Sequence, residues 1–310
     1  MLSTFKSIFS KRPTIKKNDV IKCKKMKNKI FQNGFAVANI ENDKLIRLKN
    51  IYEQNHSINN SLGGMFYSVY SQNTEYRKKI HLEIEEVVHD NYHELFLDYK
   101  VVLNSFIIKS PGNGSEFQPH QDSTGLDETK HSPLSVWIPL EDVDEKNGCI
   151  FLIPKSHHLA PIYRGISMKP NFDSIKNEIK KYFIPITLRK GEILIFDNRI
   201  IHTSSENNSD NNRVVVMSGV FPKEASIISC FLDKSTDKIE VSRQLDDFLI
   251  VNKNFYFNCT ERPYLGTLIN KVPNKIKELN ITDFEKLKIE NSIKSKLLKF
   301  SETNFNVEPI

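Results

Sequence analysis

The chain has 310 residues, of which 39% are hydrophobic and 10% aromatic, enough to bury the core of one large domain or two small ones. It contains no run of about 18 apolar residues, which excludes a membrane-spanning helix. The net charge of +6 is uneven, because ten Lys or Arg residues lie within residues 1–30 and residues 31–310 carry −3. This distribution argues against a nucleic-acid-binding surface on the main body.

Residues 1–30 are predicted to form a flexible basic arm. Apolar residues recur at helical spacing in its first nine positions, which leaves organelle targeting open, but one Arg and no small-residue cleavage site weaken that interpretation. Contact with an acidic partner is the third possibility. The four cysteines, Cys23, Cys149, Cys230 and Cys259, form no C-x-x-C pair. They predict neither a zinc knuckle nor a disulfide framework, and they favour a reducing, cytoplasmic location.

The predicted elements begin with helices and continue as short strands. A turn and a strand at 33–40 precede helices at 41–56 and 72–96, where apolar residues recur at helical spacing. Short apolar runs separated by turn residues then predict strands at 100–109, 134–143, 149–154, 182–188, 192–198 and 212–221. Residues 270–300 return to a helical pattern. The order predicts a β-sandwich or barrel backed by helices.

The pattern H-x-[DE] occurs twice, at His81–Glu83 and at His120–Asp122. The first copy lies in a predicted helix, where two residues turn the chain by about 200°, so the side chains point apart. The second follows a strand and a Pro-Gly turn, and residues two apart in extended chain share a face. The geometry therefore favours His120 and Asp122 as two ligands of one metal ion.

His202 is the candidate third ligand. It ends the segment GEILIFDNRIIHTS, in which a buried strand leads into a polar loop, and such sites often present ligands. Considered without the other two residues, a histidine at this position would more often be a capping or surface residue than a metal ligand. His157 and His158 are expected in a loop near the opening of the same site.

Two histidines and a carboxylate with open positions form the facial triad of non-haem Fe(II) oxygenases. A hydrolytic zinc site uses the same donors, so these residues alone leave the chemistry open. Arg213, at the start of the next apolar strand, favours the oxygenase. A guanidinium directed inwards is costly unless it meets an anion, and its fork suits a carboxylate. Arg213 would bind the far carboxylate of a dicarboxylic 2-oxo acid that chelates iron at its other end.

Residues 100–222 resemble the phytanoyl-CoA dioxygenase family of Fe(II)/2-oxoglutarate-dependent oxygenases. The similarity lies in the order and spacing of PHQD, SVWIPLEDVDEKNGCIFLIPKSH, GEILIFDNRIIHTS and the N-x-S-x-x-x-R motif that ends at Arg213. The segment NGFAVANI is similar to the usual opening of the family, whereas 260–310 matches nothing in it. The sequence departs at Lys155, where the family more often has Gly.

The resemblance implies a mostly β fold with flanking helices, a double-stranded β-helix of the jelly-roll or cupin-like kind. This domain would span 31–260, and 261–310 would be a helical extension acting as a lid or a dimer contact. His120, Asp122 and His202 would bind Fe(II), and Arg213 would bind 2-oxoglutarate. Further 2-oxoglutarate contacts are expected from Ser204, Trp137 and Ser105. O₂ would be the second co-substrate, with ascorbate as a supporting reductant.

The implied reaction is hydroxylation of an unactivated C–H bond in a small molecule, with succinate and CO₂ as co-products. Desaturation or cyclisation would use the same residues, and the retained Asp122 argues against a halogenase. Arg164 and His157 are predicted to bind a substrate that bears a carboxylate or phosphate. The protein is expected to be a monomer or homodimer. The alternatives are a catalytically inactive cupin-like binding protein and a metal-dependent hydrolase.

Overall fold

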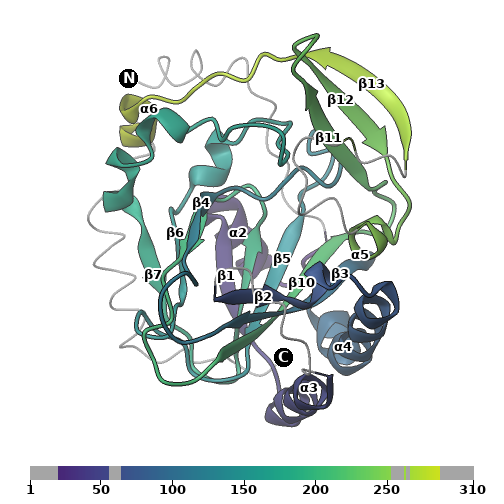
Figure 1. Cartoon of the computed structure of the whole chain (residues 1–310), viewed down its shortest axis with the longest axis vertical. Coiled ribbons are helices and arrows are strands. Elements are labelled where there is room, and N and C mark those ends of the chain that lie inside the picture. The colour runs from purple at the N-terminus through teal and green to yellow at the C-terminus, as the bar shows by residue number, and fades with distance from the viewer. Residues whose placement is uncertain (1–19, 56–63, 253–261, 263–265, 287–310) are drawn as a thin grey trace.

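The protein is a jelly roll in which two antiparallel sheets pack face to face (Figure 1). The computed structural model describes residues 20–55, 64–252, 262 and 266–286. Apolar side chains from both sheets meet in one cluster, with Trp137, Leu194 and Val215 on one side and Ile150 and Leu152 on the other. The predicted mostly β, double-stranded β-helix fold is confirmed.

The larger sheet has the strand order β1-β8-β5-β10-β3-β2, and every neighbouring pair is antiparallel. Its strands are β1 (Phe35–Asn39), β2 (Met65–Tyr67), β3 (Tyr99–Lys109), β5 (Leu134–Pro139), β8 (Glu192–Asp197) and β10 (Arg213–Pro222). The central strands are buried along most of their length because both faces of the sheet are covered, which explains why their sequences are nearly continuous apolar runs.

The smaller sheet has the order β4-β9-β6-β7. Its strands are β4 (Phe117–His120), β6 (Ile150–Leu152), β7 (Ile184–Ile186) and β9 (His202–Ser204). The short β4 and β9 were not predicted, since three or four residues of mixed polarity give no periodic signal.

Helices cover the outer face of the larger sheet. They are α2 (Lys24–Asn33), α3 (Asn42–Asn55) and α4 (Thr74–Leu95), which confirm the two predicted N-terminal helices and add one. Ile80, Ile84 and Val88 of α4 recur at helical spacing and pack in one cluster with Phe106 and Val216 of the sheet. In α4, the Asn73 side chain caps the first turn by accepting from the Tyr76 backbone amide at 3.1 Å.

Short helices lie around the open end of the jelly roll. They are the 3₁₀ helices η1 (Ser68–Tyr70), η2 (Ser156–Leu159), η3 (Asp173–Ile175) and η4 (Glu178–Tyr182) and the α-helices α5 (Phe248–Val251) and α6 (Ile281–Glu285). A third sheet, with strand order β11-β12-β13, lies beside this end (Figure 1). It consists of β11 (Ile228–Asp233), β12 (Lys238–Arg243) and β13 (Thr267–Pro273).

The expectation of a flexible arm over residues 1–30 is wrong for its last part. Val20 and Ile21 are buried in the main core, and Ile21 forms a β-bridge with Phe96. Helix α2 follows directly, because the amphipathic segment that contains Ile30 buries that side chain against the sheet. Residues 1–19 lie outside the described residues.

The expectation of a helical extension after residue 260 is also wrong in part. Residues 267–273 form β13, which pairs with the edge of β12 that β11 leaves open. This pairing provides hydrogen-bond partners for backbone groups of both strands. Among the described residues of this segment, only those of α6 are helical, and Phe284 of α6 packs beside Leu279 under η4. Residues 287–310 are not among those described, so the lid or dimer contact stays a prediction.

Candidate metal and 2-oxo acid site

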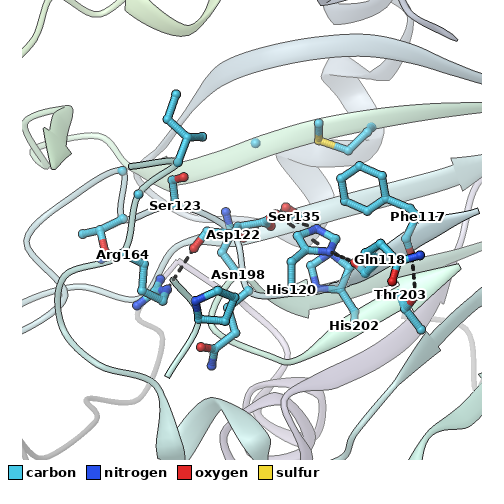
Figure 2. A pocket seen from close by; sticks show the side chains of 18 of the residues that line it. Phe117, Gln118, His120, Asp122, Ser123, Ser135, Arg164, Asn198, His202 and Thr203 are labelled. Atoms are coloured by element: carbon cyan, nitrogen blue, oxygen red, sulfur yellow. Dashed lines mark hydrogen bonds and ion pairs between the residues drawn. The ribbon is translucent and has the colours of Figure 1, made fainter. Parts of the chain in front are cut away.

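The jelly roll places His120 and His202 directly opposite each other. They are cross-strand partners in the β4–β9 pair, and their ring centroids are 4.1 Å apart. Asp122 follows β4, and its backbone amide donates to the Asn198 carbonyl oxygen at 3.0 Å. Figure 2 shows the two imidazoles and the Asp122 carboxylate gathered at one wall of the cavity. The three predicted ligands therefore meet, and their donor atoms lie within 4.8 Å of one another.

Backbone contacts fix which imidazole nitrogens face the carboxylate. His120 Nδ1 lies 2.9 Å from the Gln118 carbonyl oxygen, and His202 Nδ1 lies 3.0 Å from that of Ile200. A carbonyl oxygen can only accept, so each Nδ1 carries a proton, and Nε2 is the ring nitrogen left to face the carboxylate. Both Nε2 atoms face Asp122 Oδ1, at 3.7 Å from His120 and 3.8 Å from His202.

This arrangement calls for a cation. When both rings are neutral, their Nε2 lone pairs repel the carboxylate oxygen that they face unless a positive charge lies between them. Burial, and then the neighbouring His202, lower the pKa of His120 well below its ordinary value, so its ring is neutral and able to bind a metal at neutral pH. The contacts at Nδ1 are of the kind that orients histidines in metal sites. The donor set therefore fits a divalent ion such as Fe(II).

The same cavity contains a buried cation with unused donors. The cavity has a volume of about 630 Å³ and is lined by residues of both sheets, including all three ligands and Arg213. Arg213 is 2% exposed, and its Nε and Nη1 atoms have no hydrogen-bond partner. Its guanidinium carbon lies 5.3 Å from the centre of the Trp137 ring. Burial lowers the pKa of Arg213 to about 10, the response expected of a charge that lacks its counter-ion.

The predicted 2-oxoglutarate contacts are brought together only in part. Ser204 and Trp137 line the cavity, and their contact with 2-oxoglutarate stays a prediction. Ser105 does not, and its assignment is wrong. Its hydroxyl contacts Ser68 Oγ at 3.1 Å and accepts from the Val69 backbone amide at 3.2 Å, so it ties β3 to the start of η1.

The two predicted substrate contacts are corrected as well. His157 is 1% exposed and does not line the cavity; its Nε2 lies 3.1 Å from the Phe31 carbonyl oxygen, on the side of α2. A side chain at Gly34, which has a φ of +92°, would collide with His157, so this corner of the fold encloses the ring. Arg164 lines the cavity, but its charge is already neutralised by Glu128, which the sequence analysis missed.

Arg164 acts as a support for the Asp122 loop. Its Nη1 and Nη2 donate to the Glu128 carboxylate at 2.8 and 2.6 Å, and both side chains are buried. Its Nε donates to the Asp122 carbonyl oxygen at 2.9 Å, next to the metal-binding carboxylate (Figure 2). The guanidinium is therefore a positioning group, and it is not available to an anionic substrate.

Breaking this ion pair is expected to destabilise the fold strongly. Glu128→Ala should lower the free energy of unfolding by about 3–5 kcal/mol, because it leaves the Arg164 guanidinium buried without its counter-ion. Glu53→Ala is the control, since Glu53 pairs with Lys49 at the surface and should change stability by less than about 1 kcal/mol. Equal losses for the two variants in urea denaturation would contradict the structural role of Glu128.

The other H-x-[DE] copy behaves as predicted. His81 is a buried residue of α4, and its Nδ1 accepts a hydrogen bond from the Asn104 backbone amide at 3.1 Å. Glu83 instead contacts Lys79 and Asn55 at the helix surface.

Among the residues that the structure describes, only His120, Asp122 and His202 form a cluster that could bind a metal ion. Within the same part of the chain, no helix is long and apolar enough to cross a membrane.

Fold and site together define a jelly-roll protein with a candidate His-Asp-His metal site and a buried arginine in one cavity. The chain belongs to the phytanoyl-CoA dioxygenase family, whose sequence profile matches residues 54–215. It is 33% identical over 138 residues to phytanoyl-CoA dioxygenase domain-containing protein 1 of Danio rerio, covering 42% of this chain and 47% of the relative. It is 36% identical over 117 residues to phytanoyl-CoA dioxygenase 1 of Oryza sativa subsp. japonica, covering 36% of this chain and 41% of the relative.

The matches thus span less than half the length of these two curated relatives. Among solved structures, the chain is similar to the non-haem α-ketoglutarate-dependent epimerase SnoN from nogalamycin biosynthesis. That likeness has 14% identity and a TM-score of 0.48, and it covers 79% of this chain and 92% of the other. The chain is also similar to EctD from S. alaskensis, solved with 2-oxoglutarate and 5-hydroxyectoine. That likeness has 16% identity and a TM-score of 0.47, and it covers 70% of this chain and 83% of the other.

Proposed function

We propose that the protein is an Fe(II)- and 2-oxoglutarate-dependent dioxygenase that hydroxylates a C–H bond of a small molecule. The balanced reaction consumes substrate, O₂ and 2-oxoglutarate and releases the alcohol, succinate and CO₂. The observation that carries the proposal is the pairing, in one cavity, of two Nε2 lone pairs aimed at Asp122 with a buried guanidinium that lacks an anion. A hydrolytic metal site would leave that guanidinium unexplained.

The residues of the chain would divide the work between binding and orientation. His120, Asp122 and His202 would hold the iron through two imidazole nitrogens and a carboxylate oxygen, and the adjoining cavity would admit the co-substrates. Bound iron and 2-oxoglutarate would supply the oxidising chemistry, with O₂ as oxidant. Arg213 would bind the far carboxylate of 2-oxoglutarate, with the Ser204 hydroxyl beside it and Trp137 as one wall of the pocket. The burial of Arg213 strengthens such a charge-assisted pair by excluding water.

The lining of the cavity supports a substrate with an apolar part. Away from Arg213, the cavity wall includes Leu103 of β3, Phe221 of β10 and Leu249 of α5. Lys109 is the cross-strand partner of Arg213, and Leu103 lies six residues before Lys109 on β3. The apolar end of the cavity is therefore about 20 Å from its cationic end, measured along β3. The predicted carboxylate- or phosphate-bearing substrate depended on Arg164 and His157, and neither offers a free donor to the cavity. We therefore propose an apolar or aromatic target group.

The free, buried thiols of Cys149 and Cys230 support the proposal of a reducing, cytoplasmic setting. Cys259 lies outside the described residues. The oligomeric state, a monomer or a homodimer, stays a prediction.

Anaerobic titration tests the reaction class. Addition of Fe(II) and 2-oxoglutarate to the protein should produce a weak visible charge-transfer band from the iron–keto acid chelate, and exposure to O₂ should release succinate. His120→Ala should show neither signal, because it removes one ligand. A protein that binds Fe(II) but develops no band and releases no succinate would favour the inactive binding protein. A screen of apolar carboxylate-free compounds against acyl thioesters and small acids, scored by substrate-stimulated succinate release, would then test the substrate class.

A further inference from the structure

A second buried cation lies next to Arg213. Lys109 is the last residue of β3, it is 0% exposed, and it lines the same cavity. Lys109 and Arg213 are direct cross-strand partners in the antiparallel β3–β10 pair, so their side chains leave the sheet on the same face. The stem of Lys109 is covered by Gly148, where an added Cβ would lie 3.1 Å from Lys109 Cδ.

The surroundings of Lys109 do not neutralise it. Its ammonium group donates to the Ser205 carbonyl oxygen, and an ammonium has three N–H donors. Among the residues that the structure describes, neither Lys109 nor Arg213 has a carboxylate within salt-bridge distance, whereas the buried Arg164 is paired with Glu128. Two adjacent buried cations without a counter-ion are costly, and a bound anion would remove the cost for both.

We infer that Lys109 is a second cationic ligand for the far carboxylate of the 2-oxo acid, acting together with Arg213. This inference rests on the proposed function and deepens it, because it makes the chain selective for dicarboxylic 2-oxo acids. A carboxylate has two oxygens and about four acceptor positions, enough for the free Nε and Nη1 of Arg213 and an N–H of Lys109. The contact of Lys109 with Ser205 orients the amine towards the end of β9, three residues after the metal ligand His202.

A pH dependence follows from the position of the amine. Burial, and then the charge of Arg213, lower the pKa of Lys109 to about 7, while the Glu116 and Glu206 carboxylates act in the opposite direction. The other facing group, Cys149, has its pKa raised to about 12 by burial and stays neutral near pH 7. Anion binding favours the protonated amine, so it must raise the pKa of Lys109. Affinity for 2-oxoglutarate should therefore be constant below about pH 7 and fall above it, by at most tenfold per pH unit.

Equilibrium binding tests the inference without turnover. The protein loaded with Mn(II) is titrated by calorimetry with 2-oxoglutarate and with 2-oxopentanoate, which has the same carbon chain but lacks the second carboxylate. Lys109→Met should weaken 2-oxoglutarate binding about ten- to hundredfold at pH 7, the loss typical of a charge-assisted hydrogen bond. It should leave 2-oxopentanoate binding unchanged and abolish the loss of affinity between pH 7 and 9.

Lys100→Met is the matched control. Lys100 lies on the same strand, but it pairs with Asp246 at 2.6 Å and does not line the cavity, so its replacement should affect neither ligand. Mn(II) affinity and thermal unfolding of each variant report whether the fold is intact. A purely structural role of Lys109 would weaken both 2-oxo acids equally.

The outcomes separate the inference from the proposed function. If Lys109→Met binds 2-oxoglutarate within twofold of the unmodified protein while Arg213→Met does not bind it, the role of Lys109 is refuted and the proposed function stands. If the unmodified Mn(II)-loaded protein fails to bind 2-oxoglutarate, both are overturned.

Discussion

His202→Ala is expected to abolish specific metal binding and, with it, 2-oxoglutarate-dependent turnover. His202 supplies one of three protein donors, and its Nε2 is held towards Asp122 Oδ1 at 3.8 Å by the contact of Nδ1 with the Ile200 carbonyl oxygen. Loss of an outer-shell partner alone costs about 10–100-fold in metal affinity, so loss of the ligand itself should cost more. Equilibrium dialysis or electron paramagnetic resonance with Mn(II) measures the change.

His89→Ala serves as the control for this prediction. His89 lies on the exposed surface of α4, where its Nδ1 contacts the neighbouring Asp90 at 3.1 Å. Its replacement should leave Mn(II) affinity unaltered. Retention of stoichiometric, tight Mn(II) binding by His202→Ala would contradict the assignment of the ligand set and, with it, the proposed reaction class.

Arg213→Met is expected to weaken the binding of 2-oxoglutarate without lowering the stability of the fold. Affinity for 2-oxoglutarate should fall by about 30-fold or more, because truncation of one member of a buried charged pair costs about 2–5 kcal/mol. Mn(II) affinity should not change. Without ligand, the free energy of unfolding should stay constant or rise by up to about 3 kcal/mol, which corresponds to a pKa lowered from 12.5 to about 10 by burial.

The sign of the stability change is the informative part of that experiment. A guanidinium that formed a structural ion pair would destabilise the protein when removed, as predicted for the Arg164–Glu128 pair. An unchanged or raised free energy of unfolding, measured in urea at neutral pH, indicates a charge kept for a ligand. A fall of several kcal/mol would mean that Arg213 supports the fold, and its assignment to 2-oxoglutarate would then be wrong.

The metal ligands were predictable because their geometry is local. His120 and Asp122 are two residues apart in extended chain, so a short-range pattern selected them, whereas His202 was selected by its place after an apolar strand together with the family resemblance. The position of Arg213 at the start of β10 was predictable for the same reason. The jelly roll then adds one fact that no local pattern contains, namely that His120 and His202 are paired across β4 and β9.

The errors concern groups whose roles depend on distant partners. Arg164 was predicted to be free, but Glu128, 36 residues away in the chain, neutralises it. His157 was expected at the opening, but the corner at Gly34 encloses it. Lys109 closes an apolar strand and could have been noticed as an inward-facing cation, yet only the β3–β10 register places it beside Arg213.

The sequence by itself therefore determined the fold class, the three candidate metal donors and the arginine that lines the same cavity, since strand periodicity, residue type and motif spacing indicate which side chains share a face. Only the tertiary structure decided which charged and polar side chains are already paired and which still lack a partner. That distinction depends on contacts between segments far apart in the chain, because the cost of a buried charge is set by its surroundings rather than by its neighbours in sequence.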